Sequence, residues 1–232
     1  MPAKRRGPGT SPRVVDRWDG GVGWIAHPDE GMERTSHALA TDEGVWLLDP
    51  VDAAGVDGVV EDLGEVAGVA VLSSYHSRDA DTFALRYDVP VHVPAFFDGL
   101  VGQCDAPVER FDGGLGESDY QLLELYDDAV WSDAALWDGE TLVTTETLAT
   151  SASQTVGDER LAVSFVRRLL PPRRVLSGLE PARILVGHGE GIHEDAPAAL
   201  ESALVSARTQ APRYFLENGG YVVGALSAAL RD

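Results

Sequence analysis

The most constraining feature of this sequence is the segment from Ile184 to Leu200, ILVGHGEGIHEDAPAAL. An apolar stretch typical of a strand ends at His188, which lies between two glycines. Helix-start signals follow at once, with Asp195 as the N-cap and Pro197 in the first helical turn. The glycines allow backbone or a ligand to approach the imidazole ring closely. The segment therefore predicts a strand-to-helix connection that presents a histidine at a strand end, where a site would lie.

A second segment has the same organisation. Residues 69–94, VAVLSSYHSRDADTFALRYDVPVHVP, predict a buried strand, a polar loop, a short amphipathic helix and another strand. The polar loop carries His76, Arg78, Asp79 and Asp81. Two histidine-bearing loops thus follow two apolar strands, which favours one site built from both loops.

Length and cysteine content bound the class of protein. The chain has 232 residues and no Ser/Pro/Gly-rich linker, which predicts a single α/β domain over residues 14–232 behind a disordered tail at residues 1–13. Cys104 is the only cysteine, which excludes an internal disulfide and a thiolate metal cluster and favours a reducing cytoplasm. No stretch approaches the ~20 apolar residues of a membrane span, so we expect no membrane partner.

Charge is the strongest compositional signal. The sequence has 38 acidic and 18 basic residues, and Lys4 is its only lysine. This pattern resembles halophilic cytosolic proteins, whose self-repulsion is screened in molar salt; the alternative is an acidic protein from an ordinary cell. Such acidity also argues against a nucleic-acid partner, because phosphate binding depends on clustered Lys and Arg.

The remaining elements follow from turn signals and apolar periodicity. Strand pairs are expected around turns at residues 19–20 and 42–44, and further strands at YQLLELY, AALWDGETLVTT and RILVG. Helices are expected at 56–66, in VPAFFDGL after Pro94, and at 196–207 and 212–230.

The order of these elements resembles metallo-β-lactamase-fold proteins. The stretches LLDPVD, VLSSYHSRD, LWDGETLVTTETL and LVGHGEG carry the resemblance, which spans about residues 14 to 210. It implies an α/β (α+β) fold, a four-layer αββα sandwich of two mixed β-sheets flanked by helices. It also implies a metal site along one edge of the sandwich.

In that superfamily a THxHxDH loop grips one or two metal ions. With Ser73 and Ser74 on the TH pair, His76 falls on the second histidine, Arg78 on the aspartate and Asp79 on the final histidine. A competing register puts His76 on the first histidine and places Arg78, Ala80 and Asp81 on the other motif positions. We prefer the first register, because the apolar strand then ends where the family's strand ends.

Two later motifs complete the comparison. Glu146 in TLVTTETL falls on the family's bridging aspartate, and His188 in LVGHGEG falls on its last histidine. The histidine expected before LWDGETL is missing, and Trp131 and Asp133 lie nearby instead. The resemblance therefore implies a degenerate site.

The implied ligand set for a metal is His76, Glu146, His188 and either Asp79 or Asp81. Two nitrogens and two carboxylates could hold one divalent ion, and they suit Zn, Mn or Fe about equally. Arg78 would add a fixed positive charge against a second ion, or would replace the metal by pairing with Glu146 or Asp79. Side chains expected to contact a substrate are Arg78, Trp131 and His37.

Three hypotheses about function follow. The first is a hydrolase with at most one metal ion, acting on an ester, thioester, lactone or phosphoester through metal-bound hydroxide. The second is a metal-free pseudoenzyme that binds a small ligand or a partner. The third is an accessory protein that forms a homodimer through its C-terminal helix. The sequence contains no GxSxG elbow, phosphate loop or dinucleotide fingerprint.

Overall fold

The computed structural model describes residues 2–74, 77–97, 104–128 and 131–229. Its larger sheet has the strand order β1-β2-β3-β4-β5-β6-β7, with β1 to β4 antiparallel and β4 to β7 parallel. The strands are β1 (Arg13–Trp18), β2 (Gly21–Ile25), β3 (Thr35–Thr41), β4 (Gly44–Leu48), β5 (Val66–Ala70), β6 (Val91–Pro94) and β7 (Val108–Phe111).

A second sheet of four strands has the order β13-β10-β9-β8. Strands β10 and β13 are parallel and the other pairs are antiparallel, so both main sheets are mixed. These strands are β8 (Gln121–Asp127), β9 (Ser132–Trp137), β10 (Thr141–Thr144) and β13 (Arg183–Val186); the short pair β11 (Leu148–Ala149) and β12 (Ala162–Val163) lies apart.

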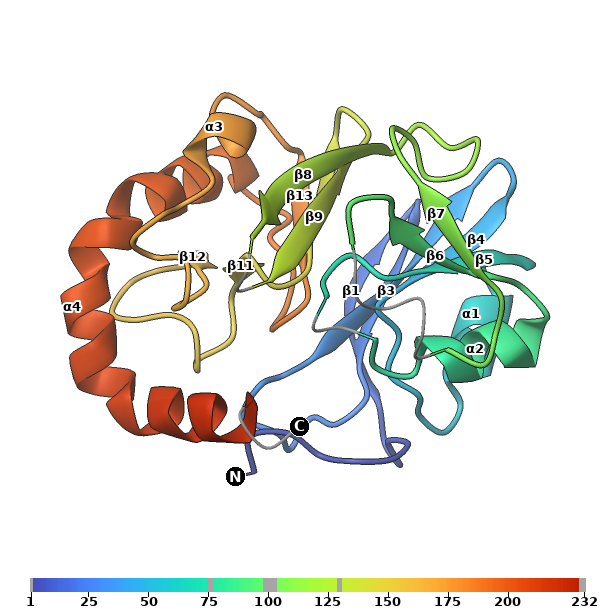
Figure 1. Cartoon of the computed structure of the whole chain (residues 1–232), viewed down its shortest axis with the longest axis horizontal. Coiled ribbons are helices and arrows are strands. Elements are labelled where there is room, and N and C mark those ends of the chain that lie inside the picture. The colour runs from blue at the N-terminus through green and yellow to red at the C-terminus, as the bar shows by residue number, and fades with distance from the viewer. Residues whose placement is uncertain (1, 75–76, 98–103, 129–130, 230–232) are drawn as a thin grey trace.

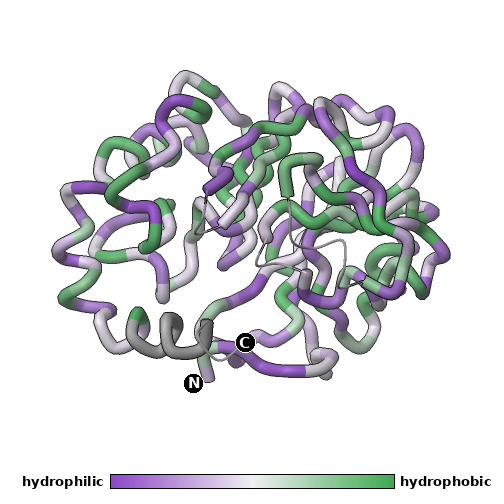
Figure 2. The backbone as a smooth tube through the Cα atoms, viewed as in Figure 1, coloured by the Kyte–Doolittle hydropathy of each residue, from purple (hydrophilic) through white to green (hydrophobic). Residues whose placement is uncertain are grey.

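Helices cover the outer face of each sheet (Figure 1). Helices α1 (Val56–Glu61) and α2 (Ala80–Tyr87) lie on the larger sheet, whereas α3 (Arg173–Leu176) and α4 (Ala196–Ala229) lie on the smaller one. Alternate residues of β9, for example, point to opposite faces: Leu136 packs toward the larger sheet and Ala135 toward α4. Figure 2 shows apolar segments along both sheets and along the helices that cover them. The predicted αββα sandwich is confirmed.

Three expected helices differ in the structure. A single helix, α4, replaces the two predicted C-terminal helices, and Pro212 lies inside it. The buried side chains of Ala211 and Tyr214 hold the chain against the domain on both sides of the proline, so α4 curves around the edge of the molecule rather than ending. After Pro94 the chain makes a turn through Phe97 instead of entering a helix; residues 98–103 are outside the described part.

Residues 2–12, expected as a disordered tail, lie against the domain. The Gly7 carbonyl contacts the His27 ring at 2.9 Å, and the Gly9 amide donates to the Asp52 carbonyl at 2.7 Å. The Arg5 carbonyl accepts a hydrogen bond from Arg34. These contacts place the N-terminal segment beside the loops that precede β3 and follow β4.

Within the described residues, no helix combines the length and apolarity required to cross a membrane.

Candidate functional site at the strand ends

His188 and Glu146 meet at the carboxyl ends of β13 and β10. These parallel neighbours end at Val186 and Thr144, so the loops that follow them emerge on the same edge of the sheet. The Nε2 atom of His188 lies 3.0 Å from Oε2 of Glu146. The histidine is buried and the glutamate is nearly so. The two residues that the sequence placed on late motif positions are therefore in contact.

The hydrogen-bond partners of His188 indicate which of its ring nitrogens carries a proton. Its Nδ1 atom lies 2.9 Å from the Met32 carbonyl oxygen, which can only accept, so Nδ1 bears a hydrogen. A hydrogen bond between Nε2 and Glu146 then requires a second proton, either on the ring or on the carboxyl group. Metal ligation through Nε2 requires that this nitrogen carry no proton.

Arg78 fills the space between three strand ends. Its Nη1 atom donates to the Thr35 carbonyl at 2.6 Å and to the Asp49 carbonyl at 2.9 Å, and its Nη2 atom donates to the Gly187 carbonyl at 3.1 Å. Arg78 itself has a φ of 42°, in the left-handed region that is unfavourable for a residue with a side chain. The guanidinium thus joins β3, β4 and β13 across the two sheets.

Acidic side chains lie near both arginines at this edge, Arg78 and Arg34. Burial lowers the pKa of Arg78 to about 10, while Asp49 and Glu146 act in the opposite direction. The side chain therefore remains a cation at neutral pH. Arg34 forms a buried bidentate pair with Glu30, at 2.7 and 2.8 Å, so a second guanidinium at this edge has its own carboxylate.

Among the residues that the structure describes, the expected metal ligands are not gathered into one group. The Asp79 carboxylate accepts a hydrogen bond from the Asp52 amide at 2.8 Å, and Asp81 accepts one from the Ala106 amide. His76 lies outside the described residues. In the described ranges, no three His, Cys, Asp or Glu side chains converge closely enough to hold a metal ion. The metal assignment of His76, Asp79, Glu146 and His188 therefore stays a prediction.

His37 belongs to a different cluster. Its Nε2 atom lies 3.2 Å from Oδ2 of Asp16, a buried residue on β1. The other carboxylate oxygen lies 3.0 Å from Nε2 of His193 and accepts the Gly191 amide at 2.8 Å. Burial would raise the pKa of Asp16, but the hydrogen bonds from His37 and His193 hold it below its usual value. This cluster fastens β1 to the loop before α4.

Trp131 is buried rather than displayed on a surface. The guanidinium of Arg167 lies 4.6 Å from its ring centroid and 4.1 Å from that of Tyr126. Arg167 also pairs with Asp128 at 2.9 Å. Trp131 therefore takes part in a cation–π stack, and its expected contact with a substrate stays a prediction.

Sequence reasoning gave no role to four buried carboxylates, Asp16, Glu30, Asp49 and Asp133. Asp133 accepts a hydrogen bond from the hydroxyl of Thr147, and its backbone pairs with Ser73 where the two sheets meet. The available signal was a charged residue within an apolar alternating strand, VVDRW for Asp16 and WSDAAL for Asp133.

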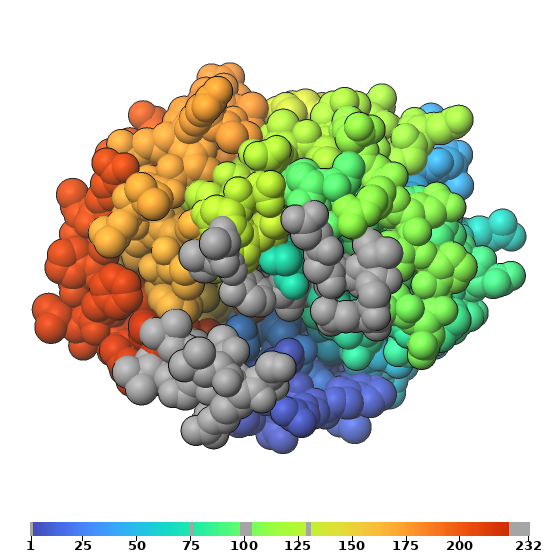
Figure 3. Space-filling model, viewed as in Figure 1, coloured from blue at the N-terminus to red at the C-terminus, as the bar shows by residue number. Residues whose placement is uncertain are grey.

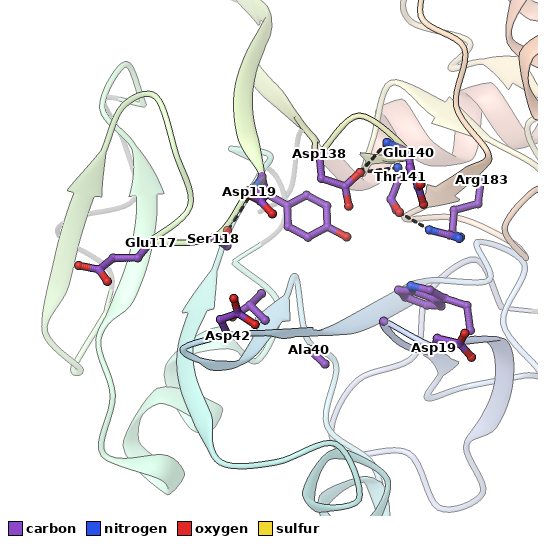
Figure 4. Close-up of a pocket in the computed structure, with 14 residues that line it drawn as sticks. Asp19, Ala40, Asp42, Glu117, Ser118, Asp119, Asp138, Glu140, Thr141 and Arg183 are labelled. Carbon is purple, nitrogen blue, oxygen red and sulfur yellow. Dashed lines mark hydrogen bonds between the residues drawn. The ribbon is translucent and has the colours of Figure 1, made fainter.

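A pocket of about 410 Å³ opens at the opposite edge of the sandwich (Figure 4). It lies at the turns β1–β2, β3–β4 and β9–β10 and at the start of β13, and β10 and β13 run away from it toward His188. Its charged lining residues are Asp19, Asp42, Glu117, Asp119, Asp138, Glu140 and Arg183. This acidic pocket is separate from the predicted site.

Comparison with solved structures identifies the fold. The chain superposes on TMB-1 with a TM-score of 0.62 and 13% identity, covering 87% of this chain and 98% of that one. It superposes on the DIM-1 metallo-beta-lactamase with a TM-score of 0.63 and 11% identity, covering 86% of this chain and 98% of that one. It superposes on the metallo-beta-lactamase FIM-1 from Pseudomonas aeruginosa, in its mono-zinc form, with a TM-score of 0.56 and 10% identity, covering 88% of this chain and 98% of that one. No family profile and no curated protein sequence matches.

Proposed function

We propose that this chain, which has the metallo-β-lactamase fold, is a metal-independent pseudoenzyme that binds a small ligand or a partner. The observation that carries the proposal is the buried guanidinium of Arg78, on the loop position where the resemblance expects a metal-binding aspartate. It binds the Thr35, Asp49 and Gly187 carbonyls.

The chemistry of the donor set supports this proposal. A divalent ion needs lone pairs, and a guanidinium has five N–H donors and no acceptor. A cation placed next to Arg78 would also be repelled in a poorly solvated environment. Of the other expected ligands, Asp79 binds the Asp52 amide, and the Nε2 atom of His188 lies 3.0 Å from the Glu146 carboxylate. The residues do not fit the two-metal centre of the fold's hydrolases.

A one-metal hydrolase of an ester, thioester, lactone or phosphoester is the second candidate, and a specific observation favours it. Glu146 and His188 already face each other at 3.0 Å. If the His76 side chain joined them, two nitrogens and one carboxylate would make the three protein ligands typical of a catalytic zinc site. This chain's Glu146 and His188 would then hold the ion, which would supply an activated water.

Metal content distinguishes the two candidates. We would purify the full chain without chelator in molar KCl, measure bound metal by mass spectrometry, and titrate Zn and Mn by calorimetry. The pseudoenzyme predicts no stoichiometric binding and no hydrolysis of ester, thioester, lactone or phosphoester substrates. One equivalent that is lost in both His76→Ala and His188→Ala, together with turnover, would assign the hydrolase. Two tightly bound equivalents with turnover would overturn both.

A charge substitution tests the role assigned to Arg78. Arg78→Asp places a carboxylate on the family's ligand position, and Arg110→Asp makes the same change at an exposed arginine that also binds backbone carbonyls. We expect divalent-ion affinity at the strand ends to rise at least about tenfold in Arg78→Asp only, because about 1.4 kcal/mol of relieved repulsion suffices. Equal affinities in both variants would contradict the proposal.

A further inference from the structure

Two segments free of acidic residues lie side by side on the face formed by α4 and the loop before α3. Residues 165–174 read FVRRLLPPRR and residues 202–216 read SALVSARTQAPRYFL, in a chain that contains 38 acidic residues. Arg173 Nε donates to the Leu204 carbonyl and Arg208 Nε to the Leu169 carbonyl, both at 2.9 Å. The segments therefore form one surface, which we call the Leu–Arg face. In Figure 3 the orange and red atoms of these regions are contiguous at the left.

This face concentrates the exposed apolar side chains of the described structure. Leu169 is 61% exposed, Leu170 64%, Val205 61% and Leu216 86%. Single exposed leucines are ordinary, but six of the eight large hydrophobic residues found exposed belong to these two segments. On α4, residues 205, 209, 212 and 216 follow the i, i+4, i+7, i+11 spacing of one outward face.

The positive charge of the face is available to a partner. Arg167 and Arg168 are buried and pair with Asp128 and Glu159. Arg173, Arg174 and Arg208 are exposed beside the leucines. The two segments contain no carboxylate, and Glu180 and Glu201 lie beside Arg173 at the edge of the face. The exposed arginines of this face contrast with the net charge of −20 of the whole protein.

Backbone polar groups at the tip of the loop before α3 already have hydrogen-bond partners within the protein. The Leu169 carbonyl accepts from Arg208, and the Leu170 carbonyl accepts from the Tyr126 hydroxyl at 2.7 Å. The Leu170 amide donates to the Arg167 carbonyl, and the two following residues are prolines, which have no N–H. Moving this tip out of water therefore leaves few polar backbone groups without partners.

We propose that the Leu–Arg face docks on an anionic lipid surface, with Leu169 and Leu170 entering the interface and the exposed arginines binding lipid phosphates. Guanidinium groups match phosphate oxygens, and aliphatic side chains enter the acyl boundary. A second copy of this chain is a less favourable partner, because a two-fold contact through this face would place arginines against arginines. The net negative charge elsewhere would orient the protein with this face toward the membrane. The sequence predicts no membrane partner because it lacks an apolar stretch long enough to span a membrane, but docking on a lipid surface needs no such stretch.

Flotation with lipid vesicles tests the proposal on the full chain. We would compare phosphatidylcholine vesicles with vesicles containing about one-third phosphatidylglycerol, in the lowest KCl at which circular dichroism shows the protein folded. We expect at least about tenfold stronger partitioning to the anionic vesicles. The double variant Leu169→Ser/Leu170→Ser should lose about tenfold or more of that partitioning, while Leu85→Ser, an equally exposed leucine on α2, should lose none.

Charge is tested in the same assay. Arg174→Glu should weaken partitioning about tenfold, whereas Arg17→Glu, the same charge change at an exposed position on β1, should not. Equal partitioning to neutral vesicles, or none to either, would overturn the proposal. So would light scattering that shows a dimer dissociated by the double leucine variant. Binding to soluble polyglutamate as strong as binding to vesicles would assign the face to an acidic protein instead.

Discussion

Replacing Arg78 with methionine should destabilise the whole domain, because its guanidinium joins three strand ends. The change leaves the carbonyls of Thr35, Asp49 and Gly187 without this donor in a buried site. A hydrogen bond to a charged group contributes about 1.5–3 kcal/mol, and release of a buried cation offsets part of the sum. We expect a net loss of about 3–5 kcal/mol in the free energy of unfolding, or a fall in Tm of roughly 6–20 °C.

Urea unfolding followed by circular dichroism measures this loss, and an unchanged m-value would show that the two-state transition is preserved. Arg110→Met is the control, since Arg110 also donates to backbone carbonyls but is exposed; its loss should stay below about 1 kcal/mol. Arg78→Lys retains the charge but lacks the planar fork, so its stability should fall between wild type and Arg78→Met. If Arg78→Met loses less than about 1 kcal/mol, the strand ends do not depend on the guanidinium.

Three further predictions concern charge and buried pairs. Because the Asp16 pKa is lowered in the folded chain, its stabilisation is present above about pH 4 and is lost as pH falls through the folded-state pKa. Asp16→Asn should remove this loss of stability at low pH, and should lower the free energy of unfolding in urea at pH 7 by about 2–4 kcal/mol. Asp112→Asn, at an exposed position, should do neither. A double-mutant cycle with Glu146→Gln and His188→Gln should give a coupling of about 1 kcal/mol, and no coupling would refute the contact. With a net charge of −20, the fold should strengthen across a KCl series in circular dichroism, and full stability in low salt would remove the halophile interpretation.

Local patterns predicted most of the strands of the two main sheets, and the resemblance assigned Glu146 and His188 to one site. Each residue follows a short apolar strand, RILV or TLVT, and the resemblance placed both strands at one edge. In the structure β10 and β13 are parallel neighbours, and the two side chains meet at 3.0 Å. Period-2 alternation and turn residues determine such elements locally, so they can be predicted from a sequence.

Contacts between distant segments could not be predicted in the same way. The partners of Arg78 are main-chain oxygens of three separate segments, and a carbonyl oxygen leaves no trace in a sequence. Asp16 and His193 are 177 residues apart, and nothing in either segment indicates the other. Pro212 was expected to separate two helices, but the buried side chains around it keep α4 continuous.

The retention of His188 and Glu146 has a structural explanation that does not require a metal. In the resemblance these positions hold an ion that ties loops from both sheets together. Here the two side chains are in contact at 3.0 Å, His188 also contacts the Met32 carbonyl, and Arg78 links the neighbouring strand ends. These contacts stabilise the edge whether or not a metal ion binds there. Substitution of either residue should therefore lower the Tm more than it changes any activity. Substitution in a catalytic pair would instead lower activity more than it lowers the Tm.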